Sequence, residues 1–137
     1  MIFGFAGAAL ALRLATASGA PDLAAAAELA RTALLRHDAA GVIGESPRLL
    51  VQLPGVAPSG PVPRGQAVAL LASYLHDYEE VAISLTSIQA PSTTRGIVQL
   101  QRSYRVPGTS DLRTQSVLLS YELTGGKWLL AELRISG

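Results

Sequence analysis

The sequence predicts an α+β domain in which helices pack on one face of a curved, mainly antiparallel sheet of four to five strands. Two observations carry this prediction. Apolar residues recur at helical spacing through much of residues 23–78, and at every second position through most of residues 81–135. A run of helices followed by a run of strands is typical of α+β domains, in which the helices segregate to one side of the sheet.

The last third of the chain is the clearest part of this pattern. Residues 95–106, 113–123 and 128–135 each alternate apolar and polar side chains, as half-buried strands do. Turn-forming residues separate them at 107–111 and at 124–127, and the second of these segments contains Gly125-Gly126, which favours a tight hairpin. We therefore expect three consecutive antiparallel strands.

The preceding residues supply the helices and the remaining strands. Pro21-Asp22 is a helix-start signal, and glycine at position 44 suits a helix end. A proline-rich loop at 54–63 can continue neither a helix nor a sheet ladder. The expected elements are a helix at 23–37, a short helical turn at 38–44, a strand at 48–53, a helix at 64–78 and a strand at 81–88.

Strand alternation also predicts which side chains face the helices. The expected inward set contains no carboxylate and no histidine: Val81, Ile83, Leu85, Val98, Leu100, Arg102, Tyr104, Val117, Leu119, Tyr121, Leu123, Leu129, Ala131, Leu133 and Ile135. The expected outer set is polar but weakly charged: Gln99, Gln101, Ser103, Ser116, Leu118, Ser120, Glu122, Trp128, Leu130, Glu132 and Arg134.

Composition excludes several classes of function. The chain is 49% hydrophobic and 15% charged, which is typical of one globular domain. Its formal net charge is +1 and its arginines are scattered, so we expect no nucleic-acid partner, because phosphate binding needs a concentrated basic face. There are no cysteines, which excludes disulfides and thiolate chemistry.

Residues 1–20 form a separate hydrophobic segment before a domain at 21–137. Its bulky apolar residues are Ile2, Phe3, Phe5, Leu10, Leu12 and Leu14. One interpretation is a signal peptide with a small-residue cleavage site at Ser18-Gly19-Ala20, and the other is a retained membrane anchor helix, against which Arg13 counts. Either interpretation predicts a protein that is exported, periplasmic or membrane-anchored facing the periplasm.

Three short motifs resemble the nuclear-transport-factor-like cone fold, the cystatin-like superfamily that includes ketosteroid isomerase and many small bacterial proteins of unknown function. They are His37-Asp38-Ala39-Ala40 after the first helix, Arg64-Gly65-Gln66-Ala67-Val68 opening the long helix, and Gly126-Lys127-Trp128-Leu129-Leu130 opening the last strand. The resemblance implies a bent sheet around helices, a conical cavity, and frequent dimers through the outer face of the sheet. It implies no activity, because the fold hosts enzymes and binding modules alike.

Enzymes of this fold place a carboxylate base on the wall of the cone, and the expected inward face has none. We therefore predict no catalytic residue, metal or cofactor. His37 is expected at a helix end, and His76 and Glu80 on the solvent side of a helix. Arg102, Tyr104 and Tyr121 remain as a ligand pocket, or alternatively as a rim arginine with two core tyrosines.

The outer face is the alternative place for a function. Trp128 and Arg134 among uncharged polar groups have an interface-like composition, and the expected contact residues are Leu118, Trp128, Leu130, Glu132 and Arg134. The sequence thus favours a non-catalytic binding or assembly module that contacts a protein partner or a second copy, for example as an accessory subunit of a membrane complex. The alternative is a small-molecule-binding cone domain or weak enzyme.

Overall fold

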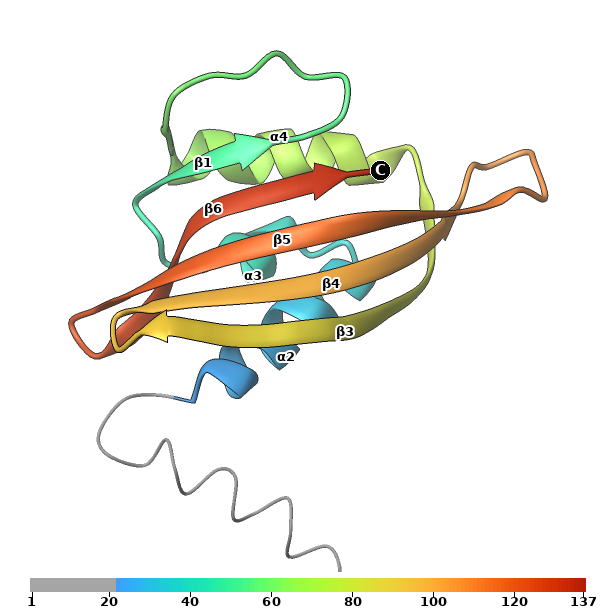
Figure 1. Ribbon diagram of the computed structural model, residues 1–137. Coiled ribbons are helices and arrows are strands. Elements are labelled where there is room, and N and C mark those ends of the chain that lie inside the picture. Colours follow the sequence, from blue (N-terminus) through green and yellow to red (C-terminus); the bar gives the residue numbers. More distant parts are fainter. Residues whose placement is uncertain (1–21) are drawn as a thin grey trace, which may run out of the picture.

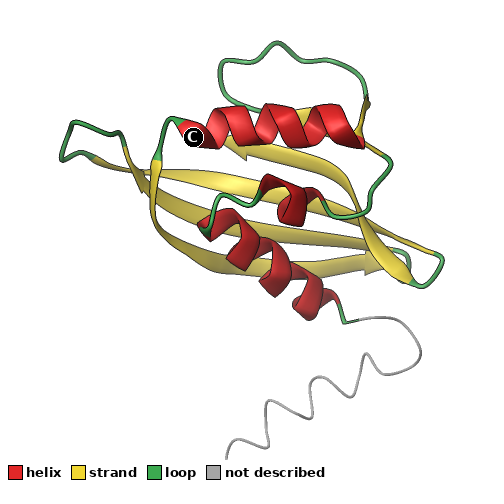
Figure 2. Cartoon of the chain, turned by 180° about the vertical axis from the view of Figure 1, so that it is seen from behind, coloured by secondary structure: helices red, strands yellow, loops and turns green. Residues whose placement is uncertain are grey.

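A computed structural model describes residues 22–137 as one mixed sheet of six strands with helices on one side (Figures 1 and 2). The spatial order of the strands is β2-β1-β6-β5-β4-β3. The elements are α2 (Leu23–Leu35), α3 (Ala39–Ile43), β1 (Arg48–Gln52), β2 (Val62–Pro63), α4 (Arg64–His76), β3 (Glu79–Ser92), β4 (Arg95–Arg105), β5 (Leu112–Thr124) and β6 (Lys127–Ser136). The α+β prediction is confirmed, with six strands where four to five were expected.

The two N-terminal helices begin and end at identifiable side chains. Asp22 caps α2 by accepting a hydrogen bond from the Ala24 amide at 2.9 Å, and Asp38 caps α3 through the Gly41 amide at 3.1 Å. Between them His37 has φ of 57°, in the left-handed region. A left-handed residue terminates a helix because the chain can then turn back on the last carbonyls, and the Asp38 amide bonds the Ala33 carbonyl at 2.8 Å. His37 thus stands at a helix end, as predicted.

The sheet is antiparallel from β3 through β6, and the parallel strand β1 extends it beyond β6. The pair β2–β1 adds a short edge that alternation could not predict, because β2 is only two residues long. At the other edge, β3 runs for 14 residues, well beyond the expected 81–88, and its pairing with β4 shifts register three times. Such bulges bend an edge strand and discourage its pairing with other chains.

The core lies between the helices and the concave side of the sheet (Figure 2). Leu34, Leu71, Leu75 and Leu133 are fully buried there. The N-terminal turn of α2 approaches β4 closely at Gly96, where a Cβ atom would lie 2.5 Å from Cδ2 of Leu23. A residue with a side chain could occupy this position only if Leu23 moved.

A bulge in β6 corrects the predicted faces of its first half. Ser120 pairs with Glu132, but its neighbour Tyr121 pairs with Leu130, so Ala131 is an extra residue. Because one extra residue reverses the alternation, every β6 side chain before Ala131 changes face. Leu130 is therefore buried at 2% exposure instead of lying outside, and Leu129 pairs with the outward Glu122.

Within residues 22–137, no helix is both long enough and apolar enough to cross a membrane. The predicted signal peptide or membrane anchor at 1–20, with its apolar residues Ile2 to Leu14, lies outside the described residues.

Candidate functional site

The inner face of the sheet holds a buried ion pair between β4 and β3. Arg102 lies on β4 at an inward position, and its side chain is fully buried. Glu80 lies at the start of β3, and its side chain is 3% exposed. Arg102 Nε donates to Glu80 Oε2 at 3.0 Å and Nη2 donates to Oε1, which gives a bidentate pair. Each charge is thus neutralised inside the domain.

A glutamine and a tyrosine extend this pair into a network. Arg102 Nη1 donates to Gln115 Oε1 at 2.8 Å, and the Tyr74 hydroxyl donates to the same oxygen at 3.1 Å. Gln115 lies on β5 and is 7% exposed, whereas Tyr74 comes from α4. Burial raises the pKa of Tyr74, and the hydrogen bond to Gln115 opposes this rise only in part. The network therefore joins α4 to three adjacent strands.

Three of the four tyrosines of the chain surround the guanidinium of Arg102. Its Cζ lies 4.4 Å from the ring centre of Tyr104, 5.5 Å from that of Tyr78 and 5.8 Å from that of Tyr74. The Tyr78 and Tyr104 rings meet edge to face, with centres 5.0 Å apart. At these distances the electron-rich faces of aromatic rings attract a guanidinium group, so the rings stabilise Arg102 in its buried position. We call Arg102, Glu80, Gln115, Tyr74, Tyr78 and Tyr104 the arginine box.

His37 connects the arginine box to the surface. Its Nε2 lies 3.0 Å from Glu80 Oε1, and its side chain is 28% exposed. A shallow cleft of about 330 Å³ opens beside this contact, lined by Leu35, Arg36, His37, Tyr78, Glu79 and Glu80. Glu80 accepts hydrogen bonds from both Arg102 and His37, so its carboxylate is engaged on both oxygens. This arrangement ties the end of α2 to the sheet, and partners from the chain itself occupy both oxygens of Glu80.

The predicted pocket of Arg102, Tyr104 and Tyr121 does not form. Arg102 and Tyr104 meet, but Tyr121 pairs across the sheet with Gly96, six residues along β4 from Arg102. At about 3.3 Å per residue this separates them by roughly 20 Å. Tyr121 instead lines another cavity, and burial alone raises its pKa. The alternative prediction is wrong for Arg102, which is fully buried and not at a rim, but it is right for Tyr104 and Tyr121, which are both buried in the core.

The prediction that Glu80 lies on the solvent side of a helix is wrong. The helix ends at His76, and β3 begins at Glu79. Glu80 pairs with the inward-facing Tyr104. Val81 is an extra residue with no partner on β4, so Glu80 and Ile83 both face inward although they are three residues apart. The alternation of β4 already put Arg102 on the inner face, and a buried arginine requires an acidic partner. That requirement could have predicted an inward-facing carboxylate such as Glu80.

The predicted interface residues divide between the two faces. Leu118, Glu132 and Arg134 follow the expected outward alternation, and Arg134 Nη2 donates to Glu132 Oε2 at 2.6 Å. Leu130 and Trp128 do not lie with them. Trp128 pairs with Leu123 and packs against the core cluster, since it precedes the bulge at Ala131.

Among residues 22–137, no three His, Cys, Asp or Glu side chains gather in a group able to hold a metal ion. Two candidate sites remain. The inner site consists of the arginine box and His37, and the outer site consists of the sheet face that no helix covers.

Sequence comparison identifies no related family: no family model and no curated protein matches this chain. Structural comparison does find similar folds. A ketosteroid isomerase-like protein from Erwinia carotovora atroseptica is 18% identical, with a TM-score of 0.66 over 82% of this chain and 90% of its own. An NTF-2 like protein of unknown function from Shewanella oneidensis is 13% identical, with a TM-score of 0.58 over 84% and 96%.

A third similar structure comes from Thiobacillus denitrificans and carries the name of a calcium/calmodulin-dependent protein kinase type II association domain. It is 12% identical, with a TM-score of 0.65 over 85% of this chain and 95% of its own. At such identities the likeness extends to the fold and to no activity. The chain therefore has the NTF-2-like cone fold, as its three sequence motifs predict.

Proposed function

We propose that the chain is a non-catalytic assembly module that pairs with a second copy of itself through the outer face of its sheet. The observation that supports this most is the uncovered state of that face. All three described helices lie on the other side of the sheet (Figures 1 and 2), and none of residues 22–137 forms a layer over the outer side.

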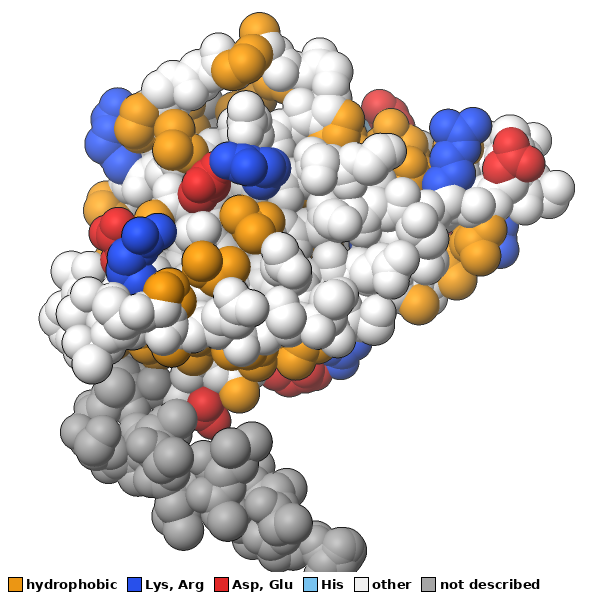
Figure 3. Space-filling view, viewed as in Figure 1, with side chains coloured by type: hydrophobic (Ala, Val, Ile, Leu, Met, Phe, Trp, Pro, Cys, Tyr) orange, Lys and Arg blue, Asp and Glu red, His pale blue; other side chains and the backbone are white. Residues whose placement is uncertain are grey.

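The composition of this face suits association. Partly exposed apolar side chains come from four different strands, namely Leu50, Ile97, Leu118 and Leu129. Around them lie serine and glutamine together with Glu122, Glu132 and Arg134, which pair across the sheet with Leu129, Leu50 and Leu118. Figure 3 shows the apolar groups interspersed with side chains of both charges. A surface that mixes apolar, uncharged polar and arginine side chains has the composition of a non-obligate protein interface.

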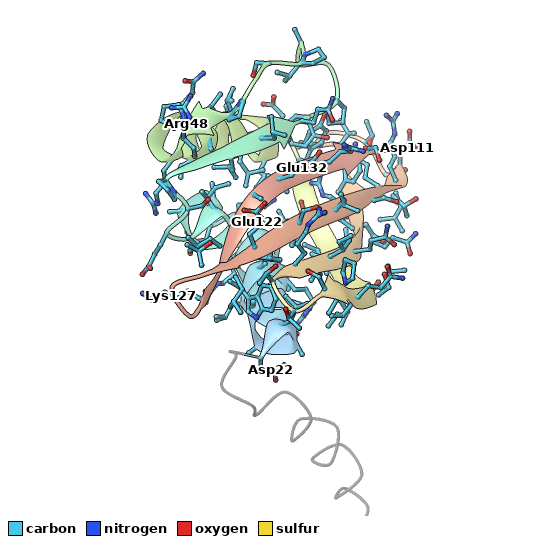
Figure 4. The ribbon with its side chains drawn as sticks, turned by 60° about the vertical axis from the view of Figure 1, so that its left-hand side comes forward. Asp22, Arg48, Asp111, Glu122, Lys127 and Glu132 are labelled. Carbon is cyan, nitrogen blue, oxygen red and sulfur yellow. The ribbon has the colours of Figure 1, made fainter. Side chains whose placement is uncertain are left out.

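The charges on this face favour a second copy over an oppositely charged partner. A hollow of about 420 Å³ is bordered by Arg48, Arg95, Glu122 and Glu132, three of which are labelled in Figure 4. The hollow has two arginines and two glutamates, and Arg134 on the same face is paired with Glu132, so the face presents charges of both signs to an identical face. In a two-fold pairing the same patch serves both copies, and an acid of one can meet an arginine of the other.

The inner face supports the non-catalytic part of the proposal. Glu80 is paired with Arg102 within the arginine box and contacts His37 as well, so its carboxylate is already engaged on both oxygens. The similar structure named as an association domain also fits a role in assembly, although that name belongs to the other protein.

The test is the molar mass of purified protein by light scattering. Leu118→Asp introduces a charge at the centre of the outer face and should convert a dimer into a folded monomer. Leu29→Asp is the matched control, because Leu29 is 71% exposed on α2, on the opposite side, and the dimer should persist. A monomeric wild type, or a Leu118→Asp variant of unchanged mass, would contradict the proposal.

We extend the proposal to the location of the protein in the cell, and this extension rests only on the composition of residues 1–20. The module is exported or held at the membrane facing the periplasm, as an accessory subunit of a larger membrane complex. Intact-mass analysis of each fraction of the native cell tests this directly. Loss of the segment indicates a cleaved signal, retention in the membrane fraction indicates an anchor, and a full-length chain confined to the soluble cytosol would overturn the extension.

A further inference from the structure

A small cavity lies between helices α2 and α3 and the hairpin of β5 and β6, away from both the arginine box and the outer face. Its volume is about 130 Å³. Most of its walls are apolar, and they include Ala26, Ala30, Ile43, Tyr121, Trp128 and Leu130. Glu45 also borders it, but this carboxylate is exposed and paired with Lys127 Nζ at 3.0 Å. Among the described residues that line the cavity, Tyr121 is the one that carries a hydroxyl group.

The hydroxyl of Tyr121 has no hydrogen-bond partner among residues 22–137. The residue is 5% exposed, and desolvation alone acts on its ionisation, in contrast to Tyr74, whose hydroxyl is bonded to Gln115. Every fully enclosed side-chain nitrogen or oxygen in this part of the chain does have a partner. The Tyr121 hydroxyl is consequently not fully enclosed, and the cavity that Tyr121 lines is the space onto which it opens.

Because the Tyr121 hydroxyl has no partner among residues 22–137 and opens onto this cavity, it is available to a group placed inside the cavity. A ligand oxygen there would supply a hydrogen-bond partner. The size is suitable, since an engineered apolar cavity of about 150 Å³ in another protein stays dry and binds benzene. The lining is more apolar than polar, and the walls come from α2, from the segment that includes α3, and from the β5–β6 hairpin.

We propose that this cavity is a binding site for a small uncharged molecule, an apolar ring or short branched chain carrying one oxygen that hydrogen-bonds to Tyr121. The apolar part lies against Ala26, Ala30 and Leu130, and the oxygen meets the tyrosine hydroxyl. Because Trp128 is the single tryptophan of the chain and lines the same cavity, its fluorescence reports occupancy directly.

Benzyl alcohol and toluene are matched probes, since they share the ring and differ by the hydroxyl group. Both should change Trp128 fluorescence saturably in wild-type protein. Tyr121→Phe removes only the tyrosine oxygen, and it should weaken benzyl alcohol binding about two- to tenfold while leaving toluene binding unchanged. Ala26→Leu fills the cavity from a half-buried position on α2 and should abolish the binding of both probes.

Cooperative urea unfolding of each variant verifies that a loss of binding is not a loss of folding. The proposal is overturned if neither probe gives a saturable change, which would leave a cavity filled by water only. It is also overturned if Tyr121→Phe weakens both probes equally, or if a folded Ala26→Leu variant binds them as the wild type does. These outcomes are independent of the dimer test, which concerns the opposite side of the sheet.

Discussion

Arg102 and Glu80 form a bidentate ion pair inside the domain, with side-chain exposures of 0% and 3%. Glu79, the residue before Glu80, and Arg105, three residues after Arg102, form a second pair between the same two strands, but that pair is solvent-exposed and 3.4 Å long. The two pairs share chemistry and neighbouring positions and differ mainly in burial. They therefore allow the effect of burial to be measured within one molecule.

Removing one partner of the buried pair should be strongly destabilising. Glu80→Ala leaves the buried guanidinium of Arg102 without its carboxylate, and we expect the free energy of unfolding to fall by about 3–5 kcal/mol. Glu79→Ala is the matched control and should cost no more than about 1 kcal/mol, because exposed pairs contribute little. Urea unfolding at neutral pH measures both values.

Replacing both partners separates the cost of an unpaired charge from the value of the pair. The double variant Glu80→Leu, Arg102→Met should recover most of the stability that Glu80→Ala loses, since apolar side chains of similar volume avoid burying any charge. A double variant as unstable as Glu80→Ala would show that the contacts of Arg102 with the three tyrosines matter more than its charge balance.

Stability should decrease at alkaline pH through the buried tyrosines. Burial raises the pKa of Tyr121 in the folded state, whereas an unfolded chain ionises it near the ordinary value of 10.0. Above about pH 10 the unfolded state therefore binds fewer protons, and the free energy of unfolding falls by up to roughly 1.4 kcal/mol per pH unit for this residue. Tyr74 acts in the same direction.

Tyr121→Phe removes one of these contributions and should flatten the alkaline decline. At neutral pH its stability should equal or exceed that of the wild type, because the hydroxyl has no hydrogen bond among the described residues to lose. Unfolding measured between about pH 8 and 11 gives both results. Parallel curves for the two proteins would show that Tyr121 ionises equally readily in the folded and unfolded states.

Because Gly96 lies very close to Leu23, a side chain at position 96 should destabilise the protein. Gly96→Ala would place a Cβ 2.5 Å from Leu23 Cδ2, and we expect it to cost about 1–3 kcal/mol by overpacking. In a Leu23→Ala background the same change should cost less than about 1 kcal/mol, because the obstructing methyl groups are gone. Gly60→Ala, where no atom lies within 4 Å, is the control. Equal costs in both backgrounds would locate the effect elsewhere.

Local patterns in the sequence determine the secondary structure and the fold class of this protein. Two-residue alternation places the C-terminal strands to within a residue or two, and helical spacing with Asp22 and Asp38 as caps places the helices. These features depend on neighbours along the chain, and one sequence therefore suffices to predict them. The motifs around His37, Gly65 and Trp128 predict the cone fold for the same reason.

The sites, by contrast, depend on single extra residues and on partners far apart in the chain. The bulge at Ala131 moves Leu130 and Trp128 to the inner face, and the bulge at Val81 lets Glu80 face Arg102. A bulge cannot be detected from the spacing of apolar residues unless the cross-strand register is known. Alternation therefore assigns the wrong face to the residues on one side of the bulge. Local patterns along the chain are enough to predict the cone and its layers. The burial of Arg102 with Glu80 and the opening of Tyr121 into a separate cavity follow from pairing across the sheet, which local patterns do not specify.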